Sequence, residues 1–126
     1  MEDNLLYRDE CYQIQGAVFE VSRVMGAGFS ETVFQECLDL ESKERGIPFR
    51  AQPELTLHYN HHVLKQHYRP DFICYDKIIL DLKALSDLTG DHRAQVPNYL
   101  RSTKLKLGLL VNSGKPPTAI VERFVF

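Results

Sequence analysis

Hydrophobic residues in the first third of the chain recur at the spacing of one face of an α-helix. Intervals of four and three residues, with no proline between them, predict an amphipathic helix from about Asp9 to Met25. A glycine-rich break follows, and Ser30 is suited to cap a second helix that has Glu31 in its first turn and ends near Gly46. The positions that this second helix is expected to bury are Val33, Phe34, Cys37, Leu38 and Leu40.

From Phe49 onward the pattern changes to a period of two, which is typical of β-strands. Residues 55–59 alternate apolar and polar side chains and predict a half-buried strand. Further strand-like runs cover residues 63–69, 72–75 and 78–85. A three-residue turn at 75–77 is expected between the last two runs. Residues 78–80 are apolar on both faces, which favours a central strand covered on both sides.

A third helix and two closing strands complete the expected order. The helix is predicted from about His92 to Ser102 and contains Pro97, which should kink it unless the helix begins close to that residue. Residues 107–111 and 120–126 predict two strands. With no internal repeat or linker, we expect a single domain over residues 1–126. Its fold class is α/β or α+β, with a mixed β-sheet flanked by helices.

Composition indicates a soluble globular protein and reveals an uneven charge distribution. The 126 residues are 44% hydrophobic and include 15 Lys and Arg against 17 Asp and Glu, for a formal charge of −2. This excludes a disordered tail, a collagen-like repeat and a disulfide mini-scaffold. Residues 1–63 carry a charge of −6 and residues 64–126 carry +4. The second half is therefore basic enough to meet a phosphate-bearing partner.

The chain gives no sign of membrane insertion, export or a cysteine-based site. No run approaches ~18 consecutive apolar residues, and the amino end MEDNLLYRDE carries acidic residues where a signal peptide would be basic. We therefore expect a cytoplasmic protein with no membrane partner. The three cysteines, Cys11, Cys37 and Cys74, are widely spaced and form no C-x-x-C pair, so zinc and disulfides lack support, and Cys11 and Cys37 are expected to act as small hydrophobes.

The residues that carry candidate chemistry are Pro70-Asp71 and, further along the chain, Asp81-Leu82-Lys83. On a strand, Asp81 and Lys83 project from one face. If the turn is at 75–77, Asp71 lies directly opposite Asp81, and the three side chains converge. Two neighbouring carboxylates need a proton or a cation between them, and a hard ion such as Mg²⁺ or Mn²⁺ would serve. The alternative is a turn aspartate and two solvated side chains flanking Leu82.

Four short motifs in this order resemble the PD-(D/E)xK nuclease superfamily and, more narrowly, the bacterial GxxExxY protein family. The first is the segment from Gly28 to Phe34, with Glu31 in place and Phe34 where that family usually has Tyr. The second and third are Pro70-Asp71 and Asp81-Leu82-Lys83, and the fourth is Gln95-Val96-Pro97-Asn98-Tyr99. The resemblance implies a restriction-endonuclease-like fold.

The resemblance also implies roles for these residues. Glu31, Asp71 and Asp81 would coordinate the metal, and Lys83 would activate water or stabilise the phosphate. Gln95 and Tyr99, which lie four residues apart and so share a helix face, would position the substrate backbone. Glu31 also suits the first turn of a helix simply because the helix dipole favours a carboxylate there.

Two other clusters are weaker candidates. Four histidines, His58, His61, His62 and His67, lie close together, but His61 and His62 would point apart on an extended chain, which argues against zinc. A set of basic residues could track phosphates or could simply form a solvated face; it comprises Arg93, Arg101, Lys104, Lys106 and Lys115, with Lys65 and Arg69 nearby in sequence. No P-loop, G-x-S-x-G, GxGxxG or H-E-x-x-H motif occurs.

The sequence thus favours a Mg²⁺- or Mn²⁺-dependent nuclease that acts on DNA or, less readily, RNA. The candidate catalytic residues are Glu31, Asp71, Asp81 and Lys83, and the candidate substrate-binding residues are Arg93, Gln95, Tyr99 and Arg101. The alternative is a non-catalytic nucleic-acid- or protein-binding module that keeps the fold. A domain of this size covers little of a duplex, which is compatible with a homodimer.

Overall fold

The computed structural model describes residues 5–126 and begins with two helices, α1 (Arg8–Met25) and α2 (Glu31–Arg45). The sequence predicted both. The predicted stripe of α1 is buried at Cys11, Ile14, Val18 and Val21. α2 ends at Gly46, whose φ of 72° is the left-handed conformation that glycine adopts without strain.

The start of α2 is fixed by a side-chain cap, and its buried face is narrower than expected. Ser30 Oγ accepts a hydrogen bond from the Val33 amide at 3.3 Å, as the sequence predicted. Phe34 and Leu38 are buried, but Leu40 is 55% exposed, so the prediction for that residue was wrong. Leu40 follows Leu38 by two positions, about 200° around the helix, and therefore faces solvent.

Five strands form a mixed sheet in the order β1-β4-β5-β6-β7. Their bounds are β1 Phe49–Ala51, β4 Phe72–Cys74, β5 Ile78–Lys83, β6 Leu107–Asn112 and β7 Ile120–Val125. Only β5 and β6 run parallel to each other, whereas every other neighbouring pair is antiparallel. Every residue of β6 is buried, and β5 is buried at most positions, which confirms the prediction of an apolar central strand.

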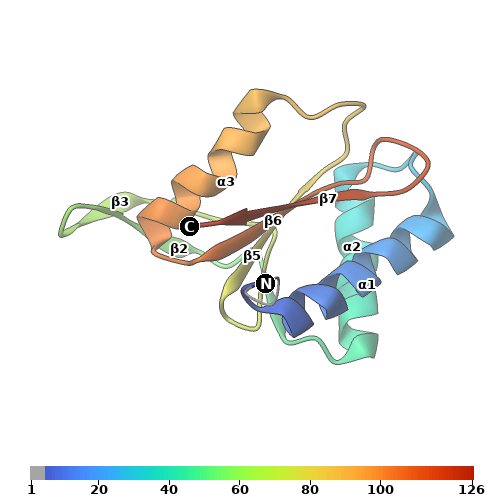
Figure 1. Ribbon diagram of the computed structural model, residues 1–126, viewed down its shortest axis with the longest axis horizontal. Coiled ribbons are helices and arrows are strands. Elements are labelled where there is room, and N and C mark those ends of the chain that lie inside the picture. The colour runs from blue at the N-terminus through green and yellow to red at the C-terminus, as the bar shows by residue number, and fades with distance from the viewer. Residues whose placement is uncertain (1–4) are drawn as a thin grey trace.

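Two strands, β2 (Leu55–Tyr59) and β3 (His62–Tyr68), form a hairpin outside the main sheet. The hairpin lies beside the third helix, α3 (Gly90–Thr103) (Figure 1). β3 is exposed along its length except at Tyr68, so it lacks the apolar faces that a place inside the central sheet would require. Three helices, a mixed five-stranded sheet and this two-stranded hairpin agree with the α+β, restriction-endonuclease-like fold expected from the sequence.

The sheet separates two hydrophobic clusters. α1 and α2 cover one face, above alternate β5 residues Ile78, Leu80 and Leu82 (Figure 1). α3 and the β2–β3 hairpin cover the other face, where Tyr68 and Ile79 are buried together with Val96, Leu100 and Leu110. Because side chains alternate along a strand, Asp81 and Lys83 project toward the same face as Ile79.

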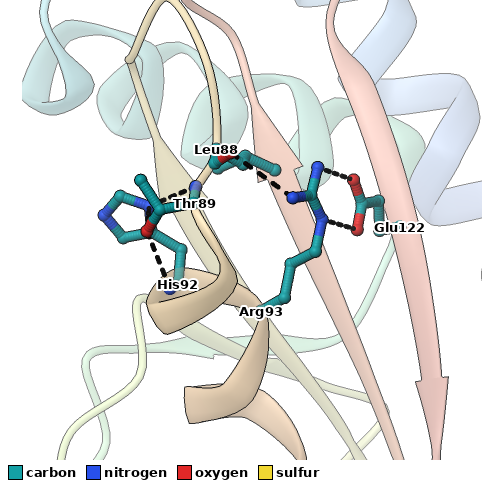
Figure 2. Close-up of polar contacts among 5 residues, drawn as sticks. All are labelled: Leu88, Thr89, His92, Arg93 and Glu122. Carbon is teal, nitrogen blue, oxygen red and sulfur yellow. Dashed lines mark hydrogen bonds and ion pairs between the residues drawn. The ribbon is translucent and has the colours of Figure 1, made fainter.

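α3 begins slightly earlier than expected and contains Pro97 well past its first turn. Its start is a capping box: the Thr89 side chain accepts from the His92 amide, while His92 Nδ1 accepts from the Thr89 amide at 3.0 Å (Figure 2).

The three cysteines are free; Cys11 and Cys74 are buried and Cys37 is half-buried, as expected for small hydrophobes. Within residues 5–126, no helix is long and apolar enough to span a bilayer.

Candidate active site

The register of the β4–β5 hairpin brings the two candidate aspartates together. Phe72 pairs with Leu80 and Cys74 with Ile78, around the turn at 75–77 that the sequence predicted. Extending this register by one pair places Asp71 opposite Asp81, and opposite residues of an antiparallel pair share a face. The two carboxylates therefore lie side by side at the end of the hairpin farthest from its turn.

Asp71 is fixed by the backbone of β5. Its Oδ2 accepts a hydrogen bond of 2.6 Å from the Leu82 amide, the residue between Asp81 and Lys83. Burial raises the pKa of Asp71 above its ordinary value, and this is opposed by the Leu82 hydrogen bond and the Lys83 ammonium. The carboxyl group is thus desolvated, oriented and close to a cation.

Asp81 is held by a residue that sequence reasoning missed as a site residue. The Tyr68 hydroxyl donates a 2.6 Å hydrogen bond to Asp81 Oδ2. Burial and the Asp71 charge raise the pKa of Asp81, while the Tyr68 hydrogen bond and Lys83 oppose the rise. Burial, together with the Asp81 charge, also raises the pKa of Tyr68, so the phenol remains a donor. A sequence signal existed, because Tyr68 is an aromatic residue at the end of a predicted strand, two residues before Pro70.

Glu31 approaches the same pair from the first turn of α2. Burial raises its pKa, with further contributions from the charges of Asp71 and Asp81, whereas Lys83 lowers it. The charge of Lys83 thus lowers the pKa of all three carboxyl groups. The structure brings together the four residues for which the sequence predicted a catalytic role.

The strand end that carries Lys83 is clamped by the end of β6. The Ser113 amide donates to the Lys83 carbonyl at 2.8 Å. The buried Asn112 side chain binds the backbone of Leu85 twice, accepting from its amide at 2.9 Å and donating to its carbonyl at 3.0 Å. Gly114 packs so closely on this segment that a Cβ there would lie 2.3 Å from the Leu85 nitrogen. These contacts fix the backbone from which Lys83 projects.

The donor set fits an open divalent-metal site rather than a closed cage. Within residues 5–126, no three or more His, Cys, Asp or Glu side chains are close enough to enclose a metal ion. Mg²⁺, however, usually keeps several waters and takes only one or two protein carboxylates together with substrate phosphates. Asp71 and Asp81 supply oxygen donors of this kind. Burial raises the pKa of Asp71 and Asp81 and thereby favours their protonated forms. An adjacent cation would oppose this effect and favour the ionised forms.

Gln95 and Tyr99 lie one helical turn apart on α3, and Tyr99 contacts Tyr68, the residue that binds Asp81. The Tyr99 ring stacks on that of Tyr68 with a centroid separation of 3.7 Å and an interplanar angle of 5°. Gln95 is exposed, and with Tyr99 and Asn98 it lines a pocket of about 280 Å³. The two residues of the Q-x-x-x-Y motif therefore line one pocket, and Tyr99 connects it to Tyr68.

The two predicted substrate-binding arginines lie in different surroundings. Arg93 forms a two-point ion pair with Glu122 on β7, at 2.8 and 2.9 Å, and also donates to the Leu88 carbonyl at 3.3 Å (Figure 2). The Arg101 side chain contacts neutral side chains within residues 5–126: it donates to Asn98 Oδ1 at 3.3 Å and lies over the Phe126 ring at 5.7 Å. The guanidinium group of Arg101 is therefore more available to an anionic ligand than that of Arg93.

The histidines do not assemble a metal site within residues 5–126. The chain is not extended at His61 and His62, and their rings stack at 4.9 Å instead of pointing apart. A tight turn, with Asn60 in the left-handed conformation, brings the two rings together. His58 Nδ1 lies 3.2 Å from the Ser102 carbonyl, and His67 faces Glu54 at 3.7 Å.

Comparison with known proteins identifies the family. No curated protein and no solved structure matches the chain. A family model described as the PD-(D/E)XK nuclease superfamily matches residues 8–124, which include Glu31, Asp71, Asp81 and Lys83. Because that match covers nearly the whole chain, the protein belongs to the PD-(D/E)XK nuclease superfamily.

Proposed function

We propose that this protein is a metal-dependent nuclease that hydrolyses phosphodiester bonds of DNA. The observation that carries the proposal is the convergence of Asp71, Asp81 and Lys83 at one end of the β4–β5 hairpin. The superfamily match supports a nuclease and a nucleic-acid substrate. The choice of DNA over RNA and the dependence on Mg²⁺ or Mn²⁺ are parts of the proposal.

Each residue has a chemical task in this proposal. Asp71 and Asp81 hold the cation through carboxylate oxygens, and Glu31 supports the site from α2. When bound, the cation would polarise the scissile phosphate and favour a nucleophilic water. Lys83 donates to the phosphate oxygens, where negative charge accumulates during attack. Asn112 and Ser113 keep the strand end in place, which limits the reorganisation that Lys83 undergoes.

Substrate binding is assigned to α3. Gln95 and Tyr99 line one pocket, Tyr99 stacks on the tyrosine that binds Asp81, and Arg101 adds an uncompensated charge farther along the helix. Arg93 can reach a phosphate only by exchanging its ion pair with Glu122, so we give it a secondary role. Narrower membership in the GxxExxY family, one nuclease-like domain over residues 1–126, a cytoplasmic location and a homodimer remain parts of this proposal.

The test is cleavage by purified protein with supercoiled plasmid and single-stranded DNA, with and without Mg²⁺ or Mn²⁺. Asp81→Asn and Lys83→Ala should each abolish cleavage while circular dichroism stays unchanged. Asp76→Asn is the charge-matched control, because Asp76 is exposed at the turn of the same hairpin. Wild-type cleavage by both site variants would refute the assignment. Salt-sensitive DNA binding with no cleavage under any condition would support the non-catalytic binding module instead.

A further inference from the structure

A polar pocket of about 370 Å³ lies between the C-terminal part of α3 and the tip of the β2–β3 hairpin. Tyr59 and Asn60 line it from the hairpin, and Asn98, Arg101 and Lys104 line it from the helix side. The hairpin residues come from the acidic first half of the sequence, and the helix residues from the basic second half. Only the fold brings the aromatic ring and the cations together.

Three polar contacts between one residue pair hold the walls of this pocket in position. The His58 amide donates to Ser102 Oγ at 3.1 Å, and Ser102 Oγ lies 3.1 Å from the His58 carbonyl, to which it can donate. His58 Nδ1 lies 3.2 Å from the Ser102 carbonyl. The hairpin is therefore joined to α3 before any ligand arrives, which reduces the entropy that binding would cost.

The pocket is cationic because its basic residues lack acidic partners. No Asp or Glu lines it, and within residues 5–126 neither Arg101 nor Lys104 forms an ion pair. Other residues of the predicted basic set are neutralised, since Arg69 pairs with Glu54, Arg93 with Glu122 and Lys115 with Asp87. Lys65 and Lys106 also form no ion pair within residues 5–126, but neither lines this pocket, so Arg101 and Lys104 are the unpaired cations of the set that lie beside the exposed Tyr59 ring.

The pocket also contains groups that suit a nucleobase. The Tyr59 side chain is 66% exposed, and its ring stacks on no other aromatic residue within the described part of the chain. The amides of Asn60 and Asn98 offer both donors and acceptors beside it. An aromatic face next to cationic and amide groups is the usual composition of a single-strand binding site.

A series of side-chain contacts connects this pocket to the aspartates. The pocket shares Asn98 and Ser102 with the neighbouring pocket that Gln95 and Tyr99 line. Tyr99 stacks on Tyr68, which is buried and donates to Asp81. The pocket and the aspartates are thus linked through residues of α3 and the β2–β3 hairpin.

We propose that this pocket binds one unpaired nucleotide of the strand held at the Asp71–Asp81 site, with its base against Tyr59 and its phosphate on Arg101 and Lys104. The inference rests on the proposed nuclease function and gives it a substrate preference. A base within a duplex has both faces covered by its neighbours, so it cannot stack on Tyr59. Single-stranded or frayed nucleic acid is therefore preferred over blunt duplex.

The experiment measures binding without cleavage. Fluorescein-labelled oligothymidylate is titrated in EDTA with the Asp81→Asn protein, and anisotropy reports the dissociation constant. Tyr59→Ala in that background should weaken binding by about 5- to 100-fold, and Tyr59→Phe should restore it. Arg101→Ala/Lys104→Ala should weaken binding at least about tenfold and reduce the slope of log K against log salt by about 1.4. Oligouridylate in parallel distinguishes ribose from deoxyribose strands.

Matched controls remove the same groups from the other side of the sheet. Tyr12→Ala removes an exposed tyrosine from α1, and Arg23→Ala/Lys43→Ala removes two charges from α1 and α2. Both should bind as the parent protein does. The inference is overturned if the pocket variants bind as tightly as the parent, if the controls weaken binding equally, or if blunt duplex binds as well as single strand.

The outcome for the pocket is separable from that for the nuclease. Pocket-dependent binding together with no cleavage by the wild type would retain the nucleotide site and remove the catalytic proposal. If the wild type cleaves and the pocket variants bind and cleave as the wild type does, the catalytic proposal is retained and the nucleotide site is removed.

Discussion

The hydroxyl of Tyr68 donates a 2.6 Å hydrogen bond to Oδ2 of Asp81, and so links the β2–β3 hairpin to the central strand of the sheet. The same ring stacks on Tyr99 of α3 at 3.7 Å. Tyr68 is thus fixed on one side by an aromatic ring and on the other by a carboxylate. Through this residue the hairpin and the helix set the orientation of Asp81.

Replacing Tyr68 by phenylalanine tests this link. Tyr68→Phe keeps the stacked ring and removes only the hydrogen bond, which favours ionised Asp81. The pKa of Asp81 should therefore rise further, and the acidic limb of the cleavage profile should move to higher pH. We expect cleavage at neutral pH to fall on the order of tenfold, since a hydrogen bond to a charged group contributes about 1.5–3 kcal/mol. Tyr12→Phe is the control, because Tyr12 is exposed on α1. A pH profile of Tyr68→Phe that coincides with that of the wild type would contradict the role assigned to Tyr68.

Asp81→Asn should stabilise the metal-free protein at neutral pH. Burial raises the pKa of the Asp81 carboxyl above its ordinary value of 3.8. The stability that this group contributes is therefore fully present below pH 3.8, where the carboxyl is protonated, and it is lost as the pH rises through the pKa of Asp81 in the folded protein. The asparagine has no such loss, and it can still accept from Tyr68. Urea unfolding should therefore show a variant advantage that grows with pH and reaches on the order of 1 kcal/mol at neutral pH. An advantage that stays constant between pH 3 and 7 would contradict this account. Asp76→Asn should change stability by less than about 0.5 kcal/mol.

Divalent metal should stabilise the wild type through the two aspartates. A ligand that binds only the folded state at 100 times its dissociation constant adds about 2.7 kcal/mol. Mg²⁺ or Mn²⁺ should therefore raise the melting temperature of the wild type and of Asp76→Asn. Asp71→Asn/Asp81→Asn should show no such rise. An equal rise in the double variant would place metal binding elsewhere, whatever the cleavage assay shows.

The sequence predicted the parts of this site that depend on local pattern. Helical spacing located α1 and α2, and Ser30 marked the start of the helix that carries Glu31. The turn at 75–77 determined the register of β4 and β5, which is why Asp71 could be placed opposite Asp81. These features depend on neighbours in sequence or on a single short connection.

The remaining features depend on contacts between distant segments. Tyr68 reaches Asp81 only because its hairpin packs on α3 instead of joining the main sheet. Arg93 was expected to meet substrate, yet it pairs with Glu122, a strand residue whose position no local pattern reveals. The pocket between α3 and the β2–β3 hairpin likewise combines Tyr59 with Arg101 from opposite halves of the chain. The hydrophobic periodicity of a sequence does not predict contacts between segments that are this far apart.

Asn112 connects the fold to the position of Lys83 and gives the last prediction. Its side chain is 2% exposed and occupies the Leu85 amide and carbonyl and the Gly114 amide. Asn112→Ala removes the partner of these part-buried groups, and since a fully buried group left unpaired costs about 1–3 kcal/mol, the free energy of unfolding should fall by about 2 kcal/mol in total. With the strand end released, kcat should fall more than KM changes, measured at a temperature where the variant stays folded. Ser113→Ala is the matched control, because the Ser113 amide still donates to Lys83. Equal losses in the two variants would mean that the Asn112 side chain has no special part in holding Lys83.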